Sequence, residues 1–162
     1  MNGQPLSSVV QDISVEERAA IEGAVARALA ACDETGKAGI AASILHGGTI
    51  IATGENEVHL QSDPTKHAEM VAIARAAQVL ASTGLSECVM ISTLQPCEMC
   101  LAAMRFAGIR RVIFAATQAR VAPKYFVFPH LSVADFQGDR DFEAIGGICE
   151  DRILHLYVTG EE

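Results

Sequence analysis

The stretch CVMISTLQPCEMCLAAMRFAGIRRVIFAA, residues 88–116, decides the fold class. It opens with the short apolar run CVMIST and closes with RVIFAA, and both runs are typical of buried strands. Between them, Pro96 is a residue favoured at the start of a helix and Gly108 one favoured at its end, so CEMCLAAMRFA is predicted to be helical. A strand, a helix and a strand in this order predict two parallel strands joined by a crossover helix.

The segments before this unit extend the same architecture. Ser14 and Glu17 have capping-box spacing ahead of a predicted helix that ends near Gly36. Residues 40–46 and 49–54 are predicted to form two strands of a hairpin, because a Gly-Gly pair separates them.

The rest of the chain alternates in the same way. After a polar loop at residues 55–61, Asp63-Pro64 predicts the start of a helix that runs to residue 81. Residues 142–145 are predicted to be an edge strand and residues 148–158 a last helix. The expected fold is α/β: a three-layer α/β/α sandwich with a mixed central sheet of about five strands, formed by one domain over residues 1–162.

Composition limits the function classes. Half of the 162 residues are hydrophobic and a fifth are charged, which is typical of a globular domain. The formal net charge of −8 disfavours nucleic acid as a partner. No apolar run is long enough to span a membrane, and the N-terminal segment has no signal-peptide pattern. Because the five cysteines are an odd number without a secretion signal, we expect a reducing, cytoplasmic location.

Cys97 and Cys100 lie in the first turn of the predicted helix, and such a C-x-x-C pair has more than one explanation. It occurs in thioredoxin-type redox proteins, and it also provides two ligands of many zinc sites. His67 lies in the first turns of another predicted helix, where by itself it would more often be a packing residue. Two helices that enter one layer from equivalent strand ends have neighbouring N-termini, which would bring one imidazole and two thiolates together. That ligand set suits Zn²⁺.

The number of ligands separates a structural zinc site from a catalytic one. Structural sites normally have four protein ligands, whereas three leave a position for water. No fourth ligand occurs at motif spacing, so the sequence predicts an open, catalytic site that lowers the pKa of a bound water to roughly 7. Glu69 is the candidate general acid/base. Since residues i and i+2 do not share a helix face, Glu69 and His67 converge only if the metal lies beyond the helix end.

The joint pattern H-A-E at residues 67–69 and P-C-x-x-C at residues 96–100 resembles the signature of the zinc deaminases. The segments DPTKHAEM and TLQPCEMC are similar to those of the cytidine deaminase superfamily, on the branch with guanine deaminase, fungal cytosine deaminase and the tRNA wobble-adenosine deaminases. The resemblance is good over residues 40–116 and loose afterwards. It implies hydrolytic deamination of a nucleobase-sized aminoheterocycle, of the guanine or cytosine type, by a homodimer or larger assembly.

The resemblance also implies roles for individual residues. Three positions match the family's Zn²⁺ ligands: His67, Cys97 and Cys100. Glu69 matches its acid/base, Asn56 an asparagine that hydrogen-bonds the substrate ring, and Ala68 a residue whose backbone N–H contacts the base. Lys66 and Gln95 depart from the family, which often has alanine at the first position and an acidic residue at the second.

Three other functions remain open. A tRNA adenosine deaminase would need residues that neutralise phosphates and usually has a basic C-terminal helix, but residues 149–162 are acidic. A non-catalytic, zinc-stabilised interaction module and a redox protein are the other two. We expect Glu98 and Met99 to be spacers between the cysteines.

The choice between guanine and cytosine is not decided by the sequence. Aromatic side chains in residues 123–136 are predicted either to form a lid that stacks on a base or to make core or dimer contacts. Three acidic residues are candidates for recognising a guanine edge, although none lies at a motif position: Asp135, Asp141 and Glu143.

Overall fold

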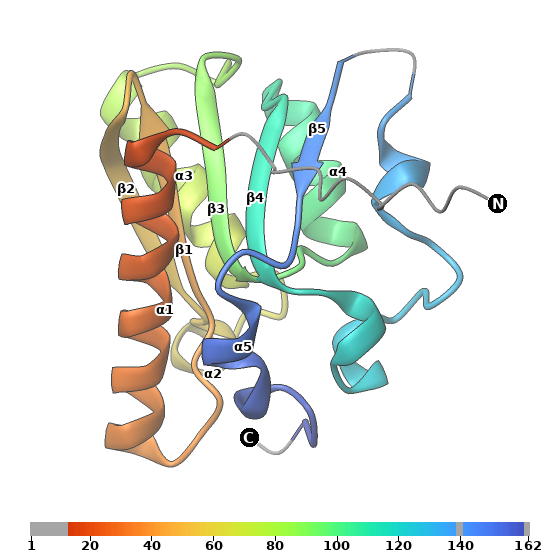
Figure 1. The fold of residues 1–162 in the computed structure, drawn as a ribbon. Helices are drawn as coiled ribbons and strands as arrows, with labels where there is room; N and C mark the ends of the chain where they lie inside the picture. Colours follow the sequence, from red (N-terminus) through yellow and green to blue (C-terminus); the bar gives the residue numbers. More distant parts are fainter. Residues whose placement is uncertain (1–12, 139–140, 161–162) are drawn as a thin grey trace, which may run out of the picture.

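The computed structural model describes residues 13–138 and 141–160 (Figure 1). In these residues the strands are β1 (Ala41–His46), β2 (Thr49–Glu55), β3 (Cys88–Leu94), β4 (Arg111–Ala116) and β5 (Glu143–Ile145). The α-helices are α1 (Val15–Thr35), α2 (Val58–Gln61), α3 (Ala68–Leu80), α4 (Glu98–Ala107) and α5 (Glu150–Ile153). Short 3₁₀ turns are η1 (Gln118–Arg120), η2 (Pro123–Tyr125), η3 (Val133–Phe136) and η4 (Leu154–Leu156). Residues 1–12, where the sequence predicts no signal peptide, lie outside the described residues. None of the described helices is long and apolar enough to cross a membrane.

The strands form a mixed sheet in the order β2-β1-β3-β4-β5. β1 is antiparallel to β2 and β3, whereas β3, β4 and β5 are parallel to one another. The β1–β2 turn is tight because Gly47 and Gly48 have φ angles of 57° and 77°, in the region that favours glycine. The mixed five-stranded sheet and the parallel β3–α4–β4 unit that the sequence predicts are therefore confirmed.

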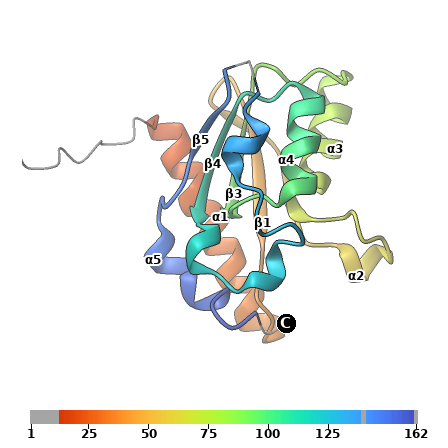
Figure 2. The same cartoon turned by 90° about the vertical axis from the view of Figure 1, so that its right-hand side faces the viewer.

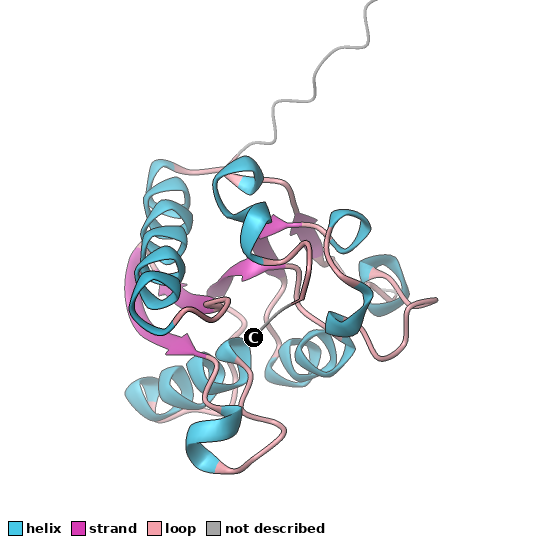
Figure 3. Ribbon diagram, turned by 90° about the horizontal axis from the view of Figure 1, so that it is seen from below, coloured by secondary structure: helices cyan, strands magenta, loops and turns pink. Residues whose placement is uncertain are grey.

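Helices cover both faces of the sheet (Figures 2 and 3). α1 and α5 lie on one face, and α3 and α4 lie on the other. The hydrophobic core has two halves accordingly: Ile91 of β3 packs in the half under α1, and its neighbour Met90 packs in the half under α3 and α4. Successive side chains of a strand point to opposite faces, so one buried strand serves both halves. The predicted three-layer sandwich is confirmed.

The start of α3 differs from the prediction. Asp63 caps a separate turn, because its Oδ1 accepts hydrogen bonds from the backbone N–H of Thr65, at 2.8 Å, and from the Thr65 hydroxyl, at 2.6 Å. The helix begins only after His67, which is the N-cap residue and has extended backbone angles, φ −62° and ψ 158°. His67 therefore lies outside the helix, and the objection that it cannot share a helix face with Glu69 does not apply.

Other boundaries also shift. α4 begins at Glu98 with Cys97 as its N-cap, not at Pro96. The predicted polar loop at residues 55–61 includes the short helix α2. The predicted last helix at residues 148–158 is limited to α5 followed by η4.

One glycine sets the distance between β2 and α3. A Cβ added to Gly54 would lie 2.2 Å from the carbonyl oxygen of Ala68 and 2.8 Å from the backbone nitrogen of Ala72. Because the backbones approach so closely, no larger residue fits at this position without moving the helix. This contact places the first turn of α3 against the end of β2.

Candidate metal centre and active-site cavity

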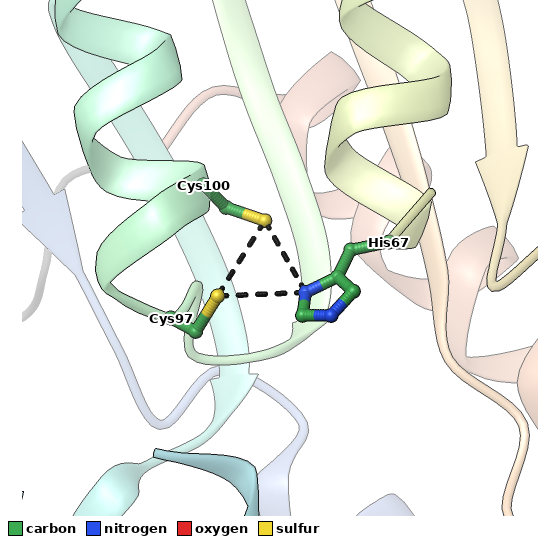
Figure 4. A group of neighbouring side chains, drawn as sticks. All are labelled: His67, Cys97 and Cys100. Carbon is green, nitrogen blue, oxygen red and sulfur yellow. Dashed lines mark hydrogen bonds between the residues drawn. The ribbon is translucent and has the colours of Figure 1, made fainter. Parts of the chain in front are cut away.

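Two helices, α3 and α4, bring their N-terminal ends together at one end of the sheet (Figure 4). Their N-cap residues are His67 and Cys97, and both have extended backbone angles. An N-cap side chain can point off the helix end, so the imidazole and the thiol face one another across the gap between the helices. Cys100, in the first turn of α4, points into the same gap.

The three side chains form a compact triangle. Nδ1 of His67 lies 3.4 Å from Sγ of Cys97 and 3.7 Å from Sγ of Cys100, and the two sulfur atoms are 3.8 Å apart. A tetrahedral zinc ion with Zn–S bonds of about 2.3 Å and a Zn–N bond of about 2.05 Å would require about 3.6 Å between N and S and about 3.8 Å between the sulfurs. The observed triangle matches those separations, so the three residues fit Zn²⁺ in donor type and in spacing.

These three residues, called the triad below, are the candidate metal ligands. Among the described residues, no other His, Cys, Asp or Glu joins this group, whose ligand atoms all lie within 4.8 Å of one another. Three protein ligands are typical of catalytic zinc sites, whereas structural sites have four. The number of ligands agrees with the open site that the sequence predicts.

The two thiols are hydrogen-bonded to each other, and their pKa values shift in opposite directions. The hydrogen bond between Sγ of Cys97 and Sγ of Cys100, followed by the contact with the neighbouring His67, lowers the pKa of Cys97 to about 4. The same hydrogen bond and burial raise the pKa of Cys100. The two sulfurs thus hold one proton between them, and a divalent cation held by these residues would displace it to solvent, as is usual for thiolate ligands.

Glu69 lies beside this triad in the first turn of α3. Its side chain is buried, with 4% of the residue exposed, and its Oε2 is 3.6 Å from Sγ of Cys100. Burial, followed by the negative charge of Cys97, raises the pKa of the Glu69 carboxyl. A carboxyl group with a raised pKa next to a metal site suits proton transfer near neutral pH.

Ser92 of β3 holds the other oxygen of Glu69, and the sequence analysis did not identify it. The Ser92 hydroxyl lies 2.9 Å from Oε1 of Glu69 and 2.7 Å from the carbonyl oxygen of Leu94. A hydroxyl has one proton and two lone pairs, so Ser92 donates to one partner at a time and accepts from Glu69 when that carboxyl carries a proton. Nothing in the local sequence distinguishes this serine from an ordinary strand residue, because the contact spans 23 positions along the chain.

A cavity of about 460 Å³ opens onto the triad. Its lining includes His67, Glu69 and Cys97, as well as the predicted substrate contacts Asn56 and Ala68. The volume lies in the range of small-molecule sites. The structure therefore brings these five predicted residues to one cavity, with Cys100 buried behind it.

The orientation of Asn56 follows from one hydrogen bond. Its Oδ1 accepts from the backbone N–H of Val58 at 3.1 Å, so Asn56 forms the turn expected of an ordinary loop residue. Because the amide oxygen is engaged there, the NH₂ group remains as a donor at the cavity wall. The turn and the cavity contact are thus compatible.

The opposite wall comes from the segment after β4. Tyr125, Val127 and Phe128 line the cavity together with Lys124, which agrees with a wall or lid at this position. The acidic candidates Asp135, Asp141 and Glu143 are not among the lining residues.

The two positions that depart from the family have local partners. Gln95 bonds to Gln118, accepting from its backbone N–H at 3.0 Å and donating to its side-chain oxygen at 3.3 Å. Lys66 does not line the cavity, and its Nζ lies 3.8 Å from Oδ2 of Asp63.

Glu98 is not the simple spacer that the sequence suggests. Only 8% of the residue is exposed, its side chain lines the cavity, and its Oε1 accepts from the backbone N–H of Phe128 at 3.2 Å. A buried acid at a substrate cavity can be recognised only once the cavity is known, because an acidic residue at a helix N-terminus is common.

Known proteins resemble this chain in sequence and in fold. The family model of the cytidine and deoxycytidylate deaminase zinc-binding region matches residues 15–116. The guanine deaminase of Bacillus subtilis (strain 168) is 38% identical over 116 residues, which cover 72% of this chain and 68% of that protein. The tRNA-specific adenosine deaminase of Aquifex aeolicus (strain VF5) is 41% identical over 83 residues, 51% of this chain, and the match spans about half (55%) of that relative's length.

A solved structure, a guanine deaminase from Nitrosomonas europaea, superimposes with a TM-score of 0.73 at 23% identity, covering 86% of this chain and 81% of that one. At that identity the likeness establishes the shared fold. The family match includes His67, Glu69 and both cysteines of the triangle. The chain belongs to the family of zinc-dependent cytidine and deoxycytidylate deaminases, and it is a hydrolytic deaminase.

Proposed function

We propose that this protein deaminates a free nucleobase of the guanine type, with His67, Cys97 and Cys100 as the Zn²⁺ ligands and Glu69 as the general acid/base. The observation that carries the proposal is that the triad and Glu69 line or adjoin one nucleobase-sized cavity. The guanine deaminase of Bacillus subtilis, whose match covers more than two thirds of both chains, supports the choice of base.

The chain's own residues account for the proton transfers. Zinc held by the triad would lower the pKa of a coordinated water to about 7 and so supply a nucleophile at neutral pH. Glu69 takes a proton from the attacking water and gives it to the ring nitrogen next to the amino-bearing carbon. It then carries the second water proton to the leaving amine, so that the C–N bond breaks and ammonia and the oxo product result. Ser92 keeps Oε1 of Glu69 fixed, which leaves Oε2 on the Cys100 side for these transfers.

Asn56 and Ala68 would orient the base. The NH₂ group of Asn56 can donate to an acceptor on the ring, and Ala68, as the first residue of α3, offers a backbone N–H without an intrahelical partner. Tyr125 and Phe128 supply aromatic surface on the facing wall.

A tRNA-specific adenosine deaminase is the second candidate, supported by the Aquifex aeolicus relative. Phosphate binding requires cations around the mouth of the site. The cavity lining includes one lysine, Lys124, and one exposed histidine, His59, while the protein has a net charge of −8. This charge distribution favours a small neutral substrate.

The test is ammonia release from zinc-loaded protein with guanine, cytosine and adenine as free bases, and inosine formation in an anticodon stem-loop as the RNA arm. We expect turnover of guanine with the highest kcat/KM. Inosine formation in the stem-loop, without release of ammonia from any free base, would reject the proposal in favour of the tRNA enzyme.

Glu69→Gln separates an enzyme from a non-catalytic, zinc-stabilised module. Loss of the acid/base should reduce kcat by about 10²- to 10⁴-fold, while zinc content and the unfolding midpoint stay near those of the unaltered protein. A Cys97–Cys100 disulfide in place of one bound zinc per chain would instead indicate a redox protein.

We also propose a cytoplasmic homodimer. Phe106, 94% exposed, and Val79, 61% exposed, lie in the last turns of α4 and α3, which run side by side (Figure 2). Covering this apolar surface with a second copy would remove both side chains from water. Phe106→Glu should then lower the molar mass measured by light scattering from that of two chains to that of one.

A further inference from the structure

Glu98 is a buried carboxylate whose contacts are incomplete. It lies between the ligands Cys97 and Cys100, is 8% exposed and lines the active-site cavity. Its contact in the structure is the hydrogen bond from the backbone N–H of Phe128, 3.2 Å from Oε1. Among residues 13–138 and 141–160, no cation forms an ion pair with it.

The other buried carboxylates are better satisfied. Glu17 receives two hydrogen bonds from Arg111 and caps its own helix through Ser14. Glu69 has Ser92 and Cys100. A carboxylate can accept about four hydrogen bonds, and the structure gives Glu98 one, from the backbone N–H of Phe128. Glu98 therefore has acceptor capacity available at the cavity wall.

We propose that Glu98 is a specificity-determining residue, which accepts a hydrogen bond from the ring N–H adjacent to the amino-bearing carbon of a guanine-type substrate. The inference rests on the proposed function and specifies its substrate. In guanine, the amino-bearing carbon lies between N3, which has no hydrogen, and N1, which carries one. If Glu69 protonates N3, the N1–H lies on the other side of the reacting carbon, where a carboxylate can accept from it.

The common alternatives lack this donor. In cytosine and in adenine, the ring atom on the far side of the amino-bearing carbon is a carbon atom without an N–H. A carboxylate placed there would be left without a donor when either base binds. A site that leaves a buried polar group unpaired discriminates strongly against the ligand that lacks the matching donor. Glu98 thus favours 2-amino-oxo heterocycles over both.

The fold also explains why Glu98 holds its position. Oε1 of Glu98 accepts the hydrogen bond from the backbone N–H of Phe128. The second oxygen, Oε2, is therefore the one available to a ligand. This contact orients the side chain before substrate enters.

The test compares guanine with 2-aminopurine, in which N1 carries no hydrogen, in the wild type and in Glu98→Gln. Glutamine keeps the acceptor that binds the Phe128 N–H and replaces the second oxygen by an NH₂ donor. We expect kcat/KM for guanine to fall on the order of 100-fold and that for 2-aminopurine to stay or rise, because the new donor faces an acceptor. Zinc content and unfolding midpoint should not change, and Glu22→Gln, at an exposed position of α1 on the other face of the sheet, serves as the control with unaltered kinetics.

Two results would overturn the inference while leaving the proposed function intact. The first is a ratio of kcat/KM for guanine to kcat/KM for 2-aminopurine that differs by less than threefold between the wild type and Glu98→Gln. The second is an equal fall in kcat/KM for both bases, which would indicate that Glu98 only holds the backbone of Phe128 in place. If the wild type releases ammonia from neither base, the proposed function fails and the inference with it. Should Glu98→Gln not fold, the wild-type preference decides, since the inference requires guanine to exceed 2-aminopurine at least tenfold.

Discussion

Ser92→Ala tests whether the acid/base is held by the sheet. The Ser92 hydroxyl is fully buried and lies 2.9 Å from Oε1 of Glu69. Alanine removes the hydroxyl and changes little else, because both residues are small. Glu69 then loses its partner on β3, and the hydroxyl proton that is donated either to Glu69 or to the carbonyl oxygen of Leu94, at 2.7 Å, is removed.

The magnitude follows from the charge of the partner. A hydrogen bond to an ionised group contributes about 1.5–3 kcal/mol, more than one between neutral groups. If this free energy is lost from the transition state, kcat falls by about 10- to 150-fold, since 1.36 kcal/mol corresponds to a factor of ten. KM should change little, because Ser92 is not among the residues that line the cavity.

The assay is steady-state ammonia release with the best substrate of the panel, together with zinc analysis and urea unfolding. Ser43→Ala is the matched control. Ser43 is also fully buried in the sheet and accepts a hydrogen bond from Arg27 at 2.7 Å, but it faces α1 on the other side. We expect a comparable loss of stability in both variants, and a loss of kcat in Ser92→Ala alone. A kcat within threefold of the wild type, with zinc bound, would refute the positioning role.

Three further predictions concern the metal, the pH dependence of stability and the packing of α3. Cys97→Ser should bind less than one zinc per chain by elemental analysis and lose ammonia release; full zinc occupancy would contradict its role as a ligand. The hydrogen bonds from Arg111 lower the pKa of Glu17. This pair therefore stabilises the fold at pH values above the ordinary glutamate pKa of about 4.3. The stabilisation is lost as the pH falls through the lower pKa of the folded state. Urea unfolding between pH 7 and pH 3 should therefore show a smaller decline for Glu17→Gln than for the wild type; equal declines would exclude the pair as a cause. Gly54→Ala should destabilise the fold by about 1–3 kcal/mol, because the added Cβ meets backbone atoms of α3. Gly23→Ala, where the added Cβ has no atom within 4 Å, should not destabilise it. Equal unfolding midpoints for the two variants would show that α3 moves to make room for the Cβ.

The sequence predicts the centre of the sheet well because β1, β3 and β4 are buried on both faces. Apolar runs at residues 88–93 and 111–116 need no tertiary information to be identified, and the helix between them makes their parallel pairing almost unavoidable. The helix starts are harder to predict, since Asp63-Pro64 is a good helix start by local preference. Only the competing turn made by Thr65 moves the start to His67 and takes this ligand out of the helix.

Some residues of the candidate site can likewise be predicted from the sequence, and others only from the tertiary structure. Residue types and spacing alone identify His67, Glu69 and the two cysteines, because metal ligation and proton transfer each require a particular side chain. The contacts of Ser92 and Glu98 exist only after β3, α3, α4 and the wall segment pack together, since each joins positions more than twenty residues apart. The sequence by itself determined the candidate chemistry, through the residue types that could bind a metal and transfer a proton. The tertiary structure decided that Ser92 contacts the Glu69 carboxyl and that Glu98 is buried at the cavity beside the backbone N–H of Phe128, because burial and hydrogen-bond partners are properties of the packed chain.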